Sequence, residues 1–148
     1  MTPERLLAAL RRAWSPASSR HWRPDNPALG QCDVTALVVQ DWLGGEILKT
    51  PLPAGWHFYN RVDGRHIDLT AAQFTAPIQY ADLPSSRGEA FAGTLPGQYP
   101  ALAARLLSAL AAGPAAGAAA SFPGPAGGPA APAERRPSDR TTAWPPSP

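Results

Sequence analysis

One cysteine, one histidine and one aspartate have the types and the chain order that catalysis by a thiol nucleophile requires. Cys32 is the single cysteine of the 148-residue chain, and His57 and Asp68 follow it. In such catalysis a thiolate attacks an acyl carbon, a histidine moves the proton, and a third polar group holds the histidine ring. The three residues therefore predict hydrolysis or transfer of an amide acyl group, if the fold brings them together.

Cys32 falls at the start of a helix that we expect over residues 32–43. Apolar residues cover most of the circumference of this segment, which is typical of a helix buried on nearly all sides, and a Gly-Gly pair follows it. The unpaired N–H groups and positive dipole end of a helix lower the pKa of a thiol placed there. We therefore expect a reactive thiol, with the backbone N–H of Cys32 and the amide of Gln31 as donors to an oxyanion.

An Asp-Gly pair at residues 63 and 64 predicts a hairpin that brings the histidine and the aspartate together. Asp-Gly is a preferred two-residue hairpin turn, and strands over residues 56–62 and 65–69 would flank it. In that register His57 pairs with Thr70, and Asp68 is its diagonal neighbour, within reach of a hydrogen bond. The polar face of the hairpin also carries Tyr59, a candidate substrate contact, together with Arg61 and His66.

The other patterns predict an α+β fold with a small antiparallel sheet packed against two or three helices. Regularly spaced leucines indicate helices over residues 3–13 and 100–112. Short strands are expected at residues 46–48 and 78–80. Residues 15–30 and 83–97 are expected to be loops because they contain turn residues and no regular period.

Composition divides the chain into a body and a tail. Residues 113–148 consist largely of Ala, Pro and Gly, which bury too little apolar surface to offset the entropy of ordering, so we expect a disordered tail. Residues 1–112 are expected to form a single compact domain. A body of this size leaves no room for a separate cofactor-binding domain.

The charge balance and the cysteine count indicate which binding partners and which cellular compartment to expect. Lys and Arg outnumber Asp and Glu by only 13 to 11, and no basic cluster is larger than a pair, so we expect neither nucleic acid nor a membrane as partner. No apolar run is long enough for a signal peptide or a membrane span. A single cysteine excludes an internal disulfide and favours the cytoplasm. No motif calls for a cofactor or a metal.

The segments GQCDVTAL, DWLGGEIL, HFYNR and DLT with the following QF, which begin at residues 30, 41, 57 and 68, are similar to the YunG-like family of small uncharacterised bacterial proteins. The resemblance covers roughly residues 5–110. A cysteine on a helix followed by a histidine and an aspartate on strands also resembles the core of papain-like and transglutaminase-like cysteine enzymes. That resemblance implies Cys32 as nucleophile, His57 as base and Asp68 as orienting acid, acting on a peptide or small amide without a cofactor.

Other interpretations of the same residues stay open. Cys32 could pack inside a non-catalytic domain that binds a peptide or small ligand, with His57 and Asp68 as a structural pair. His66 is an alternative base. Cys32, His57 and Asp68 could instead hold a metal, although they lack the closely spaced ligand pairs of strong zinc motifs. A partner protein of the toxin or immunity type is a further alternative.

Overall fold

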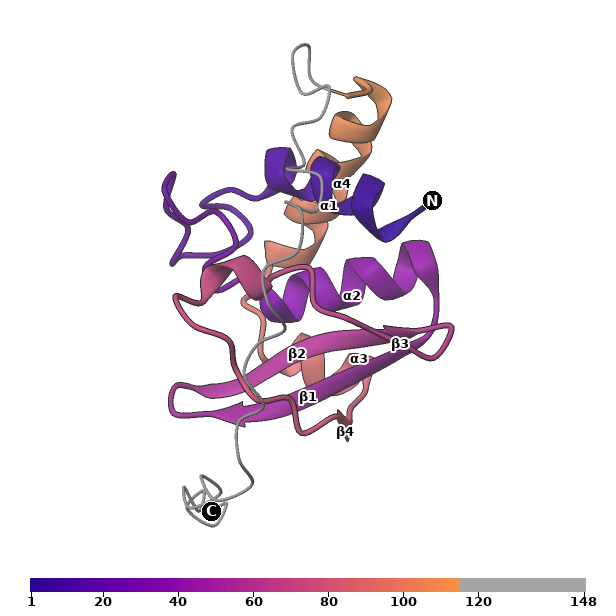
Figure 1. Cartoon of the computed structure of the whole chain (residues 1–148). Helices are drawn as coiled ribbons and strands as arrows, with labels where there is room; N and C mark the ends of the chain where they lie inside the picture. Colours follow the sequence, from indigo (N-terminus) through magenta and orange to yellow (C-terminus); the bar gives the residue numbers. More distant parts are fainter. Residues whose placement is uncertain (115–148) are drawn as a thin grey trace, which may run out of the picture. The chain divides into compact units, whose positions relative to one another are not determined.

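The computed structural model describes residues 1–114 and has an α+β fold built on a small antiparallel sheet. The sheet order is β3-β2-β1-β4 (Figure 1). These residues lie within one compact unit of the chain, Met1–Ala115. The predicted tail lies outside the described residues from residue 115 onward. The strands are β1 (Glu46–Leu52), β2 (Gly55–Val62), β3 (Arg65–Ile67) and β4 (Leu83–Pro84).

Four α-helices accompany the sheet in residues 1–114, rather than the two or three expected. The additional helix, α3 (Arg87–Ala92), falls in a segment expected to be a loop. It has only six residues, too few to show a period. It is fixed instead by the side chain of Ser86, which caps the N–H of Glu89, and by the full burial of Ala90. The other three are α1 (Pro3–Ala13), α2 (Cys32–Leu43) and α4 (Gln98–Ala111).

Helix α2 is the centre of the fold, as its apolar circumference predicted. Its residues 34–39 are all buried. Ala36 and Leu37 pack against the sheet, while Val34, Val38 and Val39 share a core cluster with leucines of α1 and α4. In Figure 1, α2 accordingly lies along the sheet, between the strands and the pair α1 and α4. Burial on both sides holds the start of α2, and with it Cys32, in a fixed position.

The hairpin forms around the predicted turn, but its second strand is shorter than expected. Asp63 and Gly64 both have positive φ, 48° and 72°, as this turn type requires. The predicted pairing of Asn60 with Ile67 is present. The expected strand pairing of His57 with Thr70 is not formed, because β3 ends at Ile67 and the chain turns into a 3-10 helix, η1 (Ala71–Gln73).

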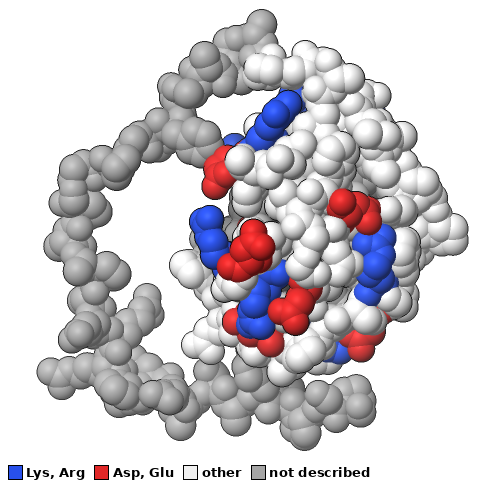
Figure 2. Space-filling view, turned by 90° about the vertical axis from the view of Figure 1, so that its right-hand side faces the viewer, with Lys and Arg blue, Asp and Glu red and all other residues white. Residues whose placement is uncertain are grey.

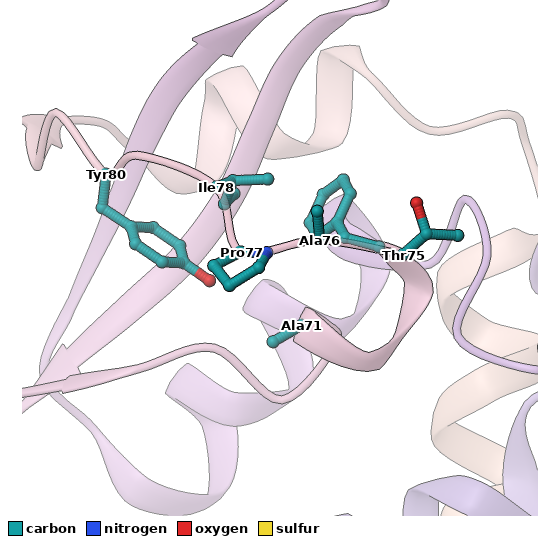
Figure 3. A pocket seen from close by; sticks show the side chains of 7 residues that line it. Ala71, Thr75, Ala76, Pro77, Ile78 and Tyr80 are labelled. Carbon is teal, nitrogen blue, oxygen red and sulfur yellow. The ribbon is translucent and has the colours of Figure 1, made fainter. Parts of the chain in front are cut away.

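The segment over residues 70–82 covers the face of β2 that was expected to be polar. His57 and Tyr59 on this face are only 2% and 1% exposed. Phe74 meets the His57 ring edge-on with the centroids 4.9 Å apart, and Tyr80 meets Tyr59 in the same way at 4.8 Å. No strand forms over residues 78–80. The segment borders a hollow of about 400 Å³, seen in Figure 3.

Basic and acidic side chains are interspersed on the face shown in Figure 2. Ion pairs in the described residues include Lys49 with Glu89 and Arg87 with Asp41, each 2.9 Å between charged atoms. Within residues 1–114, no helix has the length and apolar character to cross a membrane.

Candidate functional site

A buried histidine–aspartate pair is the best-defined part of the site. Nε2 of His57 lies 2.7 Å from Oδ2 of Asp68, and both side chains are about 3% exposed. Asp68 also accepts the backbone N–H and the hydroxyl of Thr70, at 2.9 and 3.0 Å, and the hydroxyl of Tyr80, at 2.8 Å. Burial alone would raise the pKa of Asp68, but these bonds and the His57 ring outweigh it and hold that pKa below 3.8.

His57 and Asp68 are in contact as predicted, but a turn after β3, and not strand pairing, brings them together. Asp68 is the first residue after β3, and its Oδ1 accepts the Thr70 N–H two residues further on. This local turn bends the backbone out of the sheet and aims Oδ2 at His57. The predicted register therefore places the right two residues together, although a turn occurs where the strand was expected to continue.

The bond to Asp68 also determines the state of the His57 ring. A carboxylate accepts hydrogen bonds only, so Nε2 carries the proton and Nδ1 is the acceptor of the neutral ring. The edge contact with Phe74 restricts rotation of the ring. His57 can therefore act as a proton acceptor in one fixed orientation.

Cys32 lies beside this pair, at the first position of α2. Strand β3 does not reach the first half of β2, where the backbone N–H of Phe58 acts to lower the pKa of the Cys32 thiol. Cys32 and His57 line the same cavity, which has a volume of about 490 Å³. No hydrogen bond joins the thiol to the imidazole in the described part of the chain. Such bonds are often long before a substrate is bound.

The protonation state of Cys32 differs from the expectation. Burial, followed by the neighbouring carboxylate of Asp33, raises the pKa of the thiol from 9.0 to about 12, while N–H groups of Phe58 and Asp33 act in the opposite direction. The helix N-terminus was expected to lower this pKa. Its donors are present, but desolvation of the thiolate and the adjacent negative charge outweigh them.

Two residues predicted to assist the reaction do not line the cavity. The side chain of Gln31 is fully buried, and neither its oxygen nor its nitrogen has a hydrogen-bond partner among residues 1–114. Tyr59 is buried under residues 70–82, and its hydroxyl donates to Asp82 at 2.8 Å. Adjacency to Cys32 in sequence, or to His57 on a strand, does not determine which wall of the core a side chain enters.

Other residues take up positions around the cavity. Gln73 lines it, and its Oε1 accepts the N–H of Gly30 at 3.3 Å, while its Nε2 is buried without a partner in the described residues. Asp33 and His21 line it as well. In the sequence, the signal that could have indicated Gln73 is its place in the QF pair that follows DLT, one of the segments similar to the YunG-like family.

The alternative base and the alternative metal site have no structural counterpart in residues 1–114. His66 does not line the Cys32 cavity, and its Nε2 lies 3.9 Å from Asp82 at the half-exposed edge of the sheet. No group of three or more His, Cys, Asp or Glu side chains in these residues is arranged to hold a metal ion.

Comparison with known proteins gives a consistent family assignment. A family model described as "YunG protein" matches residues 2–111. The "Uncharacterized protein YunG" of Bacillus subtilis (strain 168) is 49% identical over 96 residues, which cover 65% of this chain and 84% of that protein. No solved structure matches the chain significantly. Because the family model spans all four helices and the whole sheet, the chain belongs to the YunG family.

Proposed function

We propose that this protein is a thiol-dependent amide hydrolase or acyl transferase, with a core of the papain-like or transglutaminase-like kind. One observation carries the proposal: a buried His57, held by a hydrogen bond to Asp68, lies in the wall of a cavity that Cys32 also lines. A fixed histidine with one acceptor nitrogen beside a thiol is the arrangement that nucleophilic catalysis uses.

The reaction that follows from this arrangement has two steps. Nδ1 of His57 accepts the thiol proton while the Cys32 sulfur attacks the acyl carbon, and the protonated ring then delivers that proton to the departing amine as the C–N bond breaks. The resulting thioester is attacked by water or by an acceptor amine, which regenerates the thiol. Asp68 stays ionised throughout, as its lowered pKa supports, and keeps Nε2 protonated.

The raised pKa of Cys32 determines when the proton moves. With a pKa of about 12, the resting thiol is protonated at neutral pH. The proton must therefore be transferred to His57 during the attack, as in a serine hydrolase, instead of beforehand.

The oxyanion of the tetrahedral intermediate needs hydrogen-bond donors. The backbone N–H of Cys32 is one, because the first N–H groups of a helix lack partners within it. The Nε2 amide of Gln73 is the second, in place of Gln31, because it is buried, unpartnered among the described residues and part of the cavity wall.

One observation favours the alternative of a non-catalytic domain that binds a peptide or small ligand on the same core. The thiol is neutral at rest and makes no hydrogen bond to His57, so Cys32 could simply form part of a binding cavity.

Acylation by p-nitrophenyl acetate distinguishes these two functions. We expect a stoichiometric burst of p-nitrophenolate, with the acetyl group located on Cys32 by mass spectrometry. In His57→Ala the burst rate should fall about 100-fold, the lower end of what a general base contributes. His66→Ala is the matched control, since His66 lies on the same sheet outside the cavity.

Equal burst rates in wild type, His57→Ala and Cys32→Ala would contradict the enzyme and favour the binding domain. His57→Gln provides a second, less disruptive variant, and circular dichroism checks that each variant is folded.

A further inference from the structure

Asp33 lies where two hollows of the surface meet. It follows Cys32 in α2, and its side chain lines the Cys32 cavity. It also lines a neighbouring hollow of about 420 Å³, together with Lys49, Trp56 and Gly93. Because Asp33, Trp56 and Gly93 belong to the walls of both hollows, the carboxylate is within reach of a molecule that occupies either one.

The carboxylate of Asp33 has no cationic partner within the described residues. Its Oδ1 accepts the N–H of Val34 at 3.0 Å, and no ion pair there includes it. Glu4 and Asp63 also form no ion pair within residues 1–114, but both are exposed to water, whereas Asp33 is half-buried. The N–H of Val34 and the positive N-terminal end of α2 offset only part of the cost of burying this carboxylate, because burial still raises its pKa to about 6. The acidic residues with basic partners are Asp25, Asp41, Glu46, Asp68, Asp82 and Glu89.

Gly93 leaves room for this carboxylate. A Cβ at Gly93 would lie 2.8 Å from Oδ2 of Asp33, too close for contact between unbonded atoms. The backbone of Gly93 has φ −80°, which any residue can adopt, so space rather than conformation explains glycine here. The missing side chain therefore lets the backbone of Gly93 approach Oδ2 of Asp33 closely at this point of the wall.

The other charged groups around the two hollows form no ion pair with Asp33. His57 lines the Cys32 cavity and its charge lowers the pKa of Asp33, but its Nε2 is paired with Asp68 at 2.7 Å. Arg20 and His21 line the Cys32 cavity from the exposed loop, and neither forms an ion pair with Asp33. Lys49 is engaged by Glu89 at 2.9 Å. Asp33 is thus an accessible anion beside the thiol.

We propose that Asp33 binds a positively charged group of the substrate, a primary ammonium or a guanidinium, next to the acyl group that Cys32 attacks. The inference rests on the proposed function of the cavity, and it names the class of substrate: amides that carry a cation close to the scissile carbonyl.

Binding of such a cation would also activate the nucleophile. The negative charge of Asp33 is one of the causes that raise the pKa of Cys32. A cation seated on Asp33 offsets that charge and makes the thiol easier to deprotonate. Substrates without the cation would not form the ion pair with Asp33 and would not lower the pKa of Cys32.

Thiol modification tests the cation site without turnover. Methanethiosulfonates transfer their alkylthio group to a thiolate, forming a mixed disulfide and releasing methanesulfinate. The full-length protein is treated with the 2-aminoethyl, ethyl and 2-sulfonatoethyl reagents, which are cationic, neutral and anionic. Cys32 is the single thiol, so each rate belongs to it. Each rate is divided by that of free cysteine with the same reagent.

We expect the normalised rate of the cationic reagent to exceed that of the neutral one about tenfold, and the anionic reagent to be slowest. In Asp33→Asn this preference should disappear. Asp33→Ser serves as a second variant if the first is poorly folded. Asp63→Asn removes the same charge at a distant, exposed turn and should retain the preference. Because both reagents react with the same thiolate, the ratio of the cationic rate to the neutral rate does not depend on the fraction of Cys32 that is ionised.

A preference that is absent in wild type, or unchanged in both Asp33 variants, would overturn the inference. Its failure is distinguishable from failure of the proposed function. Acetylation of Cys32 without cation preference refutes only the Asp33 site, whereas cation preference without acetylation leaves a cation-binding cavity that is not an enzyme.

Discussion

Replacing Asp33 by Asn should make Cys32 more reactive, because it removes a negative charge next to the thiolate. Burial is the first cause of the raised Cys32 pKa and Asp33 is the second. The variant keeps the shape of the side chain and the helix position, so it changes the charge while leaving burial of the sulfur in place. The prediction therefore separates the two causes.

The size of the effect follows from the proximity of the two side chains. For adjacent residues with side-chain ends about 6 Å apart and an effective dielectric constant of about 20, the repulsion is about 3 kcal/mol, or about 2 pKa units. The Cys32 pKa should thus fall from about 12 toward about 10. Thiolate content at pH 8 would rise about 100-fold. A less basic thiolate is also about 10-fold less nucleophilic, so the rate should rise about tenfold.

The assay is modification of Cys32 by the neutral reagent methyl methanethiosulfonate, followed by intact-protein mass spectrometry. Burial raises the pKa of Asp33 itself to about 6. Above about pH 7 the carboxylate is ionised, and the variant should react faster than wild type. At about pH 5 the wild-type carboxyl is protonated and as neutral as Asn, so the two rates should converge.

A rate ratio near one at pH 8, or a ratio that does not change between pH 5 and pH 8, would refute this reasoning. Either result would mean that Asp33 does not raise the pKa of the thiol. Asp63→Asn alters net charge by the same amount at an exposed turn and should react like wild type at every pH.

Further predictions concern stability. Asp68→Ala leaves four donor groups, on His57, Thr70 and Tyr80, without their acceptor and should lower the free energy of unfolding in urea by about 3 kcal/mol. The exposed Asp25→Ala should lower it by less than about 1 kcal/mol. Because the pKa of Asp68 is lowered in the folded state, its contribution is present above about pH 4 and lost as pH falls through that lowered pKa. Melting temperatures of wild type and Asp68→Asn should therefore converge below pH 4. Gly45→Ala places a Cβ against the Arg61 carbonyl and should cost at least about 2 kcal/mol more than Gly44→Ala, which has similar φ and open space.

Local features of the sequence predicted most of the framework. Pro3 at a helix start, the Gly-Gly pair after Leu43 and the Asp-Gly turn act over a few residues, so their consequences do not depend on the rest of the chain. The pairing of His57 with Asp68 was within reach for the same reason, because eleven residues and one turn connect them.

The sequence did not predict what depends on burial and on segments far apart. The length of β3 is limited by a side-chain turn at Asp68, and α3 is held by contacts with α2 instead of by its own periodicity. Which residues line the cavity was likewise open, since Gln73 enters it and Gln31 does not.

By itself, the sequence determined that one thiol starts a buried helix and that a histidine and an aspartate meet across one turn. Only the tertiary structure decided the ionisation of that thiol. Helix-end donors that stabilise the Cys32 thiolate are local, but the loss of water around the sulfur comes from elements distant in sequence. Because desolvation is the larger effect on its pKa, the assembled fold leaves Cys32 protonated and makes its neighbours His57 and Asp33 decisive for its reactivity.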